Sequence, residues 1–331
     1  MTQWTIAVTD YDYTTFEPEQ SVIDDQNIKL ELHQCKTEAE VIEACQHADA
    51  LLNQYAPITR HVLEQLPNVK VVARYGIGVN TIDVEAATDH DVLVCNVTDY
   101  CLDEVADHTM AFVLEHARKL VTLRDSVRKG EWHFQKAAPI PRLRKQTLGL
   151  AGFGNIPRNV AEKAKPFGLR VLAYDPFVDE ATAAAAGVKL VSFETLCRES
   201  DFLSVHLPQT NETEGIFNKE AFQQMKENAL IINTSRGPVI DEHALIHALK
   251  QGEIAAASLD VLEQEPAAAD HPFRTMDNVI LTPHSAFYSE ESVIELKQKT
   301  AQNAVDVLQG RFPAYIVNRD VKEKLALAER S

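Results

Sequence analysis

The sequence predicts an α/β protein built from two doubly wound parallel sheets, and two observations support this fold class. Short apolar runs alternate with helical patterns along the first hundred residues, and a second series of such runs begins at residue 147. This alternation is typical of parallel strands with helices on both faces of the sheet. A chain of 331 residues is also long enough for two domains.

The first series contains five expected strands and then a long helix. Helical patterns cover residues 37–46 and 59–66 between the strands. The long helix is expected over 103–120, where apolar residues recur at helical spacing, with Asp103 as its N-cap. The expected strands are residues 4–8, 28–32, 48–52, 69–73 and 92–95.

The second series begins after an irregular segment, residues 121–146, which contains Gly130, two prolines and seven Lys or Arg residues. We therefore expect an arm or loop there rather than core. A last helix is expected over 289–308, where apolar residues again recur at helical spacing. The expected strands of this series are residues 147–151, 169–174, 188–191, 202–205, 229–233, 256–261 and 279–282.

A glycine turn follows the first strand of the second series. Gly152 allows the tight turn, and Gly154 lets backbone approach a pyrophosphate at the N-terminus of the next helix. Asp175 ends the next strand, where its carboxylate can accept hydrogen bonds from both ribose hydroxyls. A phosphate on that ribose would face the same carboxylate, so this Rossmann-type pattern predicts NAD rather than NADP. Any βαβ turn without a cofactor is the alternative.

The third glycine position of this fingerprint is occupied by Pro157. Proline is tolerated in the first turn of a helix, where its missing N–H would have no partner in any case. The alternative is that its ring pushes the helix away from the strand and weakens cofactor binding.

Composition narrows the class of protein. The net charge of −17 argues against a nucleic-acid partner, because binding to phosphates depends largely on Lys and Arg. No apolar run approaches about 18 residues and no signal peptide precedes the first expected strand, so we expect a cytoplasmic protein without a membrane partner. The cysteines lack C-x-x-C or zinc spacing, so we expect reduced thiols and no metal site. They are Cys35, Cys45, Cys95, Cys101 and Cys197.

Polar residues follow three strands of the second series, and ligands of open α/β sheets bind at such strand ends. Arg236, Glu265 and His284 lie in these segments, which span residues 233–237, 260–266 and 282–285. Each has an ordinary alternative explanation: a solvated turn, a surface carboxylate and a hydrogen-bonded loop histidine. Their common position at strand ends indicates a site.

Seven ordered motifs along essentially the whole chain resemble those of the D-isomer-specific 2-hydroxyacid dehydrogenases. Besides the glycine turn, the motifs are residues 74–83, 96–97 with 104–109, 206–210, 232–237, 259–261 with 265–266, and 281–284. The resemblance implies a Rossmann-type NAD domain, residues 103–298, inserted in a flavodoxin-like substrate domain, residues 1–102 and 299–331. It also implies an active cleft between the two domains, hinged by the helices at 103–120 and 289–308, and a homodimer contact through the 121–146 arm. A mobile surface loop is the alternative reading of that arm.

The resemblance assigns a role to each candidate site residue. His284 matches the acid/base, because imidazole suits proton transfer near neutral pH. Glu265 matches the carboxylate that orients this histidine and raises its affinity for a proton. Formate dehydrogenases of the family have Gln there, so Glu argues for keto-acid chemistry. Arg236 matches the arginine whose planar fork holds the substrate carboxylate and carbonyl.

Two further sets of residues follow from the same resemblance. Backbone N–H groups of one segment would bind the substrate carboxylate, with Arg74 and Tyr100 nearby; that segment is Ile77, Gly78 and Val79. The residues expected to bind NAD are Gly152, Gly154, Asn155, Ile156, Asp175, Pro208, Thr234, Asp260 and Thr109.

The resemblance to subfamilies leaves the substrate open. Tyr100 and residues 286–289 resemble D-lactate dehydrogenases, whereas residues 102–107 with 284–290 resemble the C-terminal-binding-protein corepressors and their phosphoglycerate-dehydrogenase-like relatives. We expect an enzyme that transfers hydride between NAD(H) and a small D-2-hydroxyacid or 2-keto acid, with 3-phosphoglycerate or hydroxypyruvate/glyoxylate next in order. The alternative is an NAD(H)-sensing, corepressor-like binding protein with little turnover.

Overall fold

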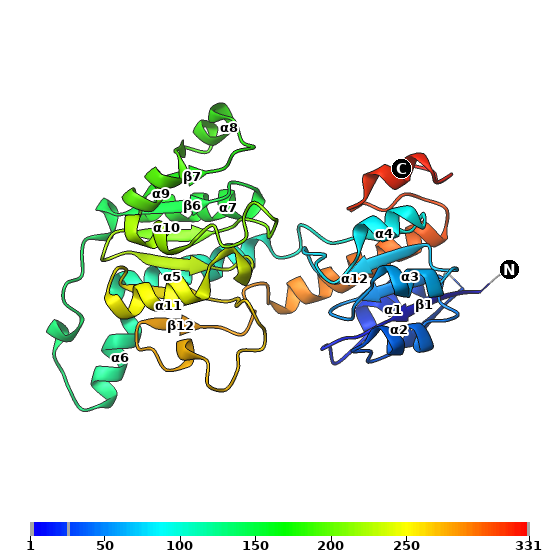
Figure 1. The fold of residues 1–331 in the computed structure, drawn as a ribbon, viewed down its shortest axis with the longest axis horizontal. Helices are drawn as coiled ribbons and strands as arrows, with labels where there is room; N and C mark the ends of the chain where they lie inside the picture. The colour runs from blue at the N-terminus through cyan, green and yellow to red at the C-terminus, as the bar shows by residue number, and fades with distance from the viewer. Residues whose placement is uncertain (1–2, 25–26, 330–331) are drawn as a thin grey trace. The chain divides into compact units, whose positions relative to one another are not determined.

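The computed structural model describes residues 3–24 and 27–329, which form two compact units (Figure 1). The first unit combines residues 1–100 with 289–331, and the second comprises residues 101–288. Each unit is an α/β layer structure around one parallel sheet, so the predicted fold class is confirmed. All the strand-like runs of the sequence become strands, and the central ones are apolar segments that helices bury, whereas the edge strands β2, β8 and β12 are only partly covered.

The first unit has a five-stranded parallel sheet in the order β2-β1-β3-β4-β5. Val41 of α2, Val62 of α3 and Ala86 of α4 pack on one face of it, and α1 and α12 pack together on the other. The strands are β1 (Trp4–Val8), β2 (Ile28–Leu32), β3 (Ala50–Asn53), β4 (Val71–Arg74) and β5 (Leu93–Cys95). The helices are α1 (Glu17–Ile23), α2 (Glu38–Ala44), α3 (Arg60–Gln65), α4 (Val84–Asp89), α12 (Glu290–Leu308) and the 3-10 helix η6 (Arg319–Glu323).

The second unit has a seven-stranded parallel sheet in the order β12-β11-β10-β9-β6-β7-β8. The strands are β6 (Thr147–Ala151), β7 (Arg170–Tyr174), β8 (Lys189–Leu190), β9 (Phe202–Val205), β10 (Leu230–Asn233), β11 (Ala256–Leu259) and β12 (Val279–Leu281). The helices are α5 (Leu102–Arg118), α6 (Leu120–Arg128), α7 (Asn155–Ala164), α8 (Glu180–Ala185), α9 (Phe193–Glu199), α10 (Lys219–Gln224) and α11 (Glu242–Gln251). Short 3-10 turns are η1 (Phe134–Ala137), η2 (Leu143–Lys145), η3 (Lys165–Phe167), η4 (Gly237–Val239) and η5 (Pro272–Arg274).

Alternate residues of its strands face two separate cores, which is why this sheet is doubly wound. On β10, Ile231 packs with α9, α10 and α11, whereas Leu230 and Ile232 pack with α5, α7 and α8. Strand side chains alternate between the two faces of a sheet, so a strand buried on both faces is mainly apolar. All four residues of β9 and of β10 are buried accordingly.

Three sequence-based boundaries need correction or comment. Asp103 was expected to be the N-cap of the long helix, but the N-cap is Cys101 and it makes no side-chain cap. Asp103 instead lies in the first turn, where it accepts a hydrogen bond from Asn159 of α7. The 121–146 segment is less irregular than expected because α6 covers its beginning. The whole of α12 belongs to the first unit, so the expected boundary at 298/299 falls inside a continuous helix.

Candidate functional site

The glycine turn between β6 and α7 has the conformation that its sequence predicts. Gly152 has φ of +98°, and a Cβ there would lie 2.8 Å from the main-chain oxygen of His206. Only glycine fits that position. A Cβ at Gly154, the N-cap of α7, would meet nothing within 4 Å. The N-terminus of α7 therefore faces open space, and the N–H groups of Asn155 and Ile156 lie in its first turn.

Pro157 does not displace α7 from the sheet. It is the third residue of the helix, and its ring is buried. The first turn closes normally, since the N–H of Arg158 donates to the oxygen of Gly154 at 3.2 Å. Val160 and Ala161 are fully buried in the core that α7 shares with α5. The alternative in which proline pushes the helix away from the strand is therefore wrong.

Asp175 lies directly after β7, beside the glycine turn. Its Oδ2 accepts the N–H of Phe153 at 2.8 Å, and its Oδ1 accepts the N–H of Phe177 at 2.9 Å. These bonds fix the carboxylate, and each oxygen retains lone-pair capacity for a further donor. A pair of ribose hydroxyls is such a donor set, so the turn and this carboxylate together fit a dinucleotide.

His284 and Glu265 form a pair on adjacent loops after β12 and β11. The Nδ1 of His284 lies 2.7 Å from Oε2 of Glu265, and both side chains are about one-third exposed. Burial raises the pKa of Glu265, but several interactions together outweigh it and hold that pKa below its usual value. They are the hydrogen bond and charge of His284, the N–H of Leu262 and the charge of Arg236. Glu265 therefore stays a carboxylate that faces Nδ1 of the imidazole.

The turn that carries His284 is held by a buried carboxylate. His284 has φ of +51°, in the left-handed region that few non-glycine residues adopt. Asp260, which is 3% exposed, accepts the Thr282 hydroxyl at 2.5 Å and the N–H groups of Ser285 and Ala286 at 2.9 Å each. Its main-chain oxygen also accepts the N–H of His284 at 2.9 Å. Asp260 thus fixes the backbone on both sides of the imidazole.

Arg236 lies on the loop after β10 and is half-buried. Gly237 brings this loop against the one that leads to Glu265, because a Cβ on Gly237 would overlap the backbone of Leu262 at 1.9 Å. Asn233, 1% exposed, braces the loop by donating from its side-chain amide to the oxygen of Arg236 at 2.9 Å. The sequence analysis missed the bracing roles of Gly237 and Asn233; their position around Arg236 was the available signal.

The remaining predicted cofactor residues are placed as follows. Thr109 of α5 is fully buried, and its hydroxyl lies 3.2 Å from the hydroxyl of Thr234 at the end of β10. Pro208 is exposed in the loop after β9, and its oxygen accepts the hydroxyl of Thr213 at 2.5 Å. The second unit therefore brings Arg236, Glu265 and His284 to one edge of its sheet, with the Thr109–Thr234 contact beneath.

The predicted substrate residues lie in the first unit, at the carboxyl end of β4 and after β5. The guanidinium of Arg74 crosses the backbone at Gly76, which has φ of +131° and where a Cβ would lie 1.6 Å from Nη1. Ile77, Gly78 and Val79 are partly exposed in the following loop. That loop is fixed by the amide of Asn96, which donates to the oxygen of Ile77 at 2.7 Å. The side chain of Tyr100 is buried, with 7% exposed.

Two features are absent from the described part of the chain. Within residues 3–24 and 27–329, no cluster of three His, Cys, Asp or Glu side chains could hold a metal ion. In the same residues, none of the helices has both the length and the apolar character required to span a bilayer.

Comparison with known proteins places this site in a family. The family model described as "D-isomer specific 2-hydroxyacid dehydrogenase, NAD binding domain" matches residues 110–286. The chain belongs to the D-isomer-specific 2-hydroxyacid dehydrogenase family. The resemblance expected from the sequence is thereby confirmed, and so is NAD as the cofactor of the second unit.

Three relatives illustrate the range of this dehydrogenase family. A D-3-phosphoglycerate dehydrogenase of Methanocaldococcus jannaschii is 39% identical over 85% of this chain and 54% of its own length. A glyoxylate reductase of Korarchaeum cryptofilum is 38% identical over 85% of this chain and 86% of its own. A solved D-lactate dehydrogenase of Lactobacillus jensenii with NAD⁺ is 27% identical with a TM-score of 0.78, over 95% of this chain and 99% of its own. The chain spans about half the length of the first of these relatives.

Proposed function

We propose that this chain is an NAD-dependent dehydrogenase that transfers hydride between NAD(H) and a small D-2-hydroxyacid or its 2-keto acid. The observation that carries the proposal is the 2.7 Å contact between His284 and Glu265, on a turn that buried Asp260 holds. A histidine backed by a carboxylate is the arrangement required for general acid–base work near neutral pH. Arg236, close enough to lower the pKa of Glu265, supplies a cation beside it.

Under this proposal each group has a role in the reduction of a keto acid. Bound NADH supplies the hydride. Because Nδ1 of His284 faces Glu265, Nε2 is the atom that donates a proton to the forming alkoxide. Arg236 holds the substrate carboxylate and carbonyl with its planar fork. In the first unit, Ile77, Gly78 and Val79 are the residues proposed to bind substrate through their backbone N–H groups. Residues 1–102 and 299–331 then act as the substrate domain.

The substrate order stays as the sequence suggests: an undetermined D-2-hydroxyacid first, with 3-phosphoglycerate or hydroxypyruvate/glyoxylate close behind. The relatives support both of the latter, since they are named as D-3-phosphoglycerate dehydrogenases and glyoxylate reductases. Arg74 is the additional cation that a phosphate-bearing substrate would use. Tyr100 is proposed to line the substrate side.

A panel of 2-keto acids tests the proposal: pyruvate, glyoxylate, hydroxypyruvate, 3-phosphohydroxypyruvate and 2-ketoisocaproate, each with NADH and followed by loss of NADH absorbance. We expect turnover of at least one, and a fall in kcat of about 10²–10⁴-fold in His284→Ala with NADH affinity kept. Tight NADH binding without turnover of any acid would contradict the proposal and support a corepressor-like protein. Wild-type rates in His284→Ala would remove His284 from its role.

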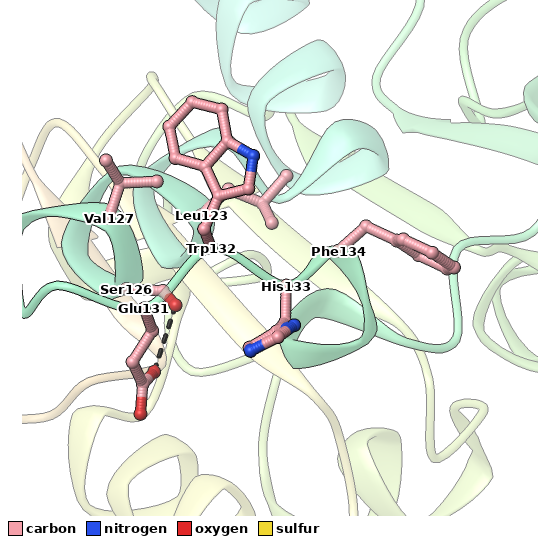
Figure 2. Close-up of a pocket in the computed structure, with 7 residues that line it drawn as sticks. All are labelled: Leu123, Ser126, Val127, Glu131, Trp132, His133 and Phe134. Carbon is pink, nitrogen blue, oxygen red and sulfur yellow. Dashed lines mark hydrogen bonds between the residues drawn. The ribbon is translucent and has the colours of Figure 1, made fainter.

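We also propose that the chain forms a homodimer through the 121–146 arm. Within the arm, Trp132, Phe134 and Val127 are 82%, 78% and 48% exposed, and Leu120 directly before it is 57% exposed. Large exposed apolar side chains in one segment favour an interface. Figure 2 shows the side chains of Trp132 and Phe134 pointing in different directions from the chain that follows α6. Both side chains line an open hollow of about 310 Å³. Its lining is Leu123, Ser126, Val127, Glu131, Trp132, His133 and Phe134.

Light scattering on the purified chain tests the dimer. We expect twice the chain mass for the wild type and a shift to monomer for the double variant Trp132→Ser, Phe134→Ser. The exposed Phe177, far along the sequence, gives a matched control as Phe177→Ser. A wild-type monomer at micromolar concentration would contradict the dimer.

The cytoplasm is the proposed location, in line with cysteines that are all buried and form no disulfide among the described residues.

A further inference from the structure

Two neighbouring residues of α5 contact two of the three loops that carry the proposed catalytic side chains, those of His284 and Arg236. The Nε2 of His108 lies 3.1 Å from the hydroxyl of Thr282, two residues before His284. The hydroxyl of Thr109 lies 3.2 Å from that of Thr234, two residues before Arg236. Thr282 and Thr234 follow β12 and β10, so one stretch of α5 touches both loops at equivalent positions.

The contact of His108 belongs to a chain of hydrogen bonds with a fixed direction. A carboxylate only accepts, so the Thr282 hydroxyl gives its one hydrogen to Asp260 at 2.5 Å. The same hydroxyl must then accept from His108, whose Nε2 therefore carries the hydrogen. Burial lowers the pKa of His108 and the charge of Asp260 only partly opposes this, so the ring is neutral at neutral pH. The edge of its ring packs against Phe112 at a centroid distance of 4.6 Å.

Asp260 connects this chain of hydrogen bonds to the turn of His284. It accepts the N–H groups of Ser285 and Ala286, and its own oxygen accepts the N–H of His284. The turn needs such support because His284 has a positive φ. A small displacement of the imidazole would move Nε2 relative to the reacting oxygen, and rates depend steeply on that geometry.

We propose that His108 is a positioning residue for His284, acting through Thr282 and Asp260. The inference rests on the proposed function, in which His284 is the proton donor. In addition, a residue of α5 stabilises the position of the His284 turn, although α5 carries no catalytic group itself. Thr109 provides the equivalent contact for the loop of Arg236.

Kinetics of His108 variants test the proposal. We expect His108→Leu, which keeps the packing on Phe112 but cannot donate, to lower kcat roughly 10-fold while NADH affinity and the KM of the keto acid change less than about 2-fold. His108→Gln keeps a side-chain N–H and should restore most of the rate. In a Thr282→Val background, His108→Leu should lower kcat little further, because the hydrogen bonds that link His108 to Asp260 are already lost.

The outcomes separate the two proposals. A wild-type chain that turns over no keto acid contradicts the proposed function. If the wild type is active, any of three results overturns the positioning role alone. The first is a normal kcat in His108→Leu, and the second is a kcat in His108→Gln no higher than in His108→Leu. The third is that the effects of His108→Leu and Thr282→Val on kcat are fully additive. A measurement independent of activity is the ¹⁵N spectrum of the His108 ring. We expect a neutral ring with its hydrogen on Nε2 at neutral pH, and a neutral ring with its hydrogen on Nδ1 would overturn the chain of hydrogen bonds.

Discussion

Two turns of the second unit solve the same backbone problem in different ways. Gly152 adopts a positive φ of +98° at no steric cost, since it has no Cβ. His284 adopts a positive φ of +51° although it has a side chain, and buried Asp260 holds it there through the backbone around it. The cofactor turn therefore depends on an absent side chain, whereas the catalytic turn depends on a network. Adding a Cβ at Gly152 should therefore disrupt the cofactor turn, and replacing the acceptor Asp260 should disrupt the catalytic turn.

The largest effect is expected from removing the acceptor. Asp260→Asn keeps the shape but replaces one carboxylate oxygen by an NH₂ group, which would face backbone N–H groups or the Thr282 hydroxyl. Unsatisfied groups at this buried position should cost about 1–3 kcal/mol of unfolding free energy, and kcat should fall about 10²-fold as the turn loses its geometry. Denaturant unfolding and steady-state kinetics measure the two effects. An unchanged kcat would show that the turn of His284 keeps its conformation without the Asp260 carboxylate.

The next effect is expected at the cofactor turn. In Gly152→Ala the new Cβ would lie 2.8 Å from the oxygen of His206, in a backbone conformation that alanine rarely adopts. We expect NADH affinity to fall at least about 10-fold, with a stability loss of about 1–3 kcal/mol. Fluorescence titration with NADH measures the affinity. Gly154→Ala is the matched control for the stability loss alone, since a Cβ there meets no protein atom within 4 Å, and an equal loss of stability in both variants would contradict the comparison.

A pH profile sharpens the account of the catalytic pair. Burial raises the pKa of Glu265, but the bond and charge of His284 help to hold it below its usual value, so an ionised carboxylate lies beside the proposed proton donor. Glu265→Gln removes that negative charge. The basic limb of kcat/KM for keto-acid reduction should move to lower pH, because the proton donor loses its anionic partner. A shift to higher pH would contradict this sign.

The smallest effect is expected in cofactor choice. Asp175→Ala removes the carboxylate that would meet a 2′-phosphate, while the bonds from Phe153 and Phe177 are lost with it. The preference for NADH over NADPH should narrow about 10-fold, with kcat for NADH changed less than its KM. The ratio of kcat/KM values for the two cofactors measures this. An unchanged ratio would remove Asp175 from ribose binding.

The comparison of the two turns also shows which features of the fold and site could be predicted from the sequence. The strands were predictable because parallel strands covered on both faces are continuously apolar, and the glycine turn was predictable because glycine itself marks the backbone. His284 and Glu265 were recognisable as strand-end residues, and their 2.7 Å contact agrees with that reading. The N-cap assigned to Asp103 failed because tertiary contacts with α7 use that side chain instead.

The network around the catalytic turn could not be predicted in the same way. His108 and Thr282 are 174 residues apart in the sequence, and only the packing of α5 against the end of β12 makes them neighbours. The close approach of Gly237 to Leu262 likewise depends on how two loops pass each other. Such long-range contacts leave no periodic or local signal in a single sequence.

A crystal of the chain with NAD⁺ and a non-reactive 2-keto acid analogue tests the central claim most directly. The account predicts that Nε2 of His284 lies within about 2.6–3.2 Å of the analogue's keto oxygen. It also predicts that the guanidinium of Arg236 is paired with the analogue's carboxylate. An analogue bound with its keto oxygen away from His284, or held without Arg236, would contradict it.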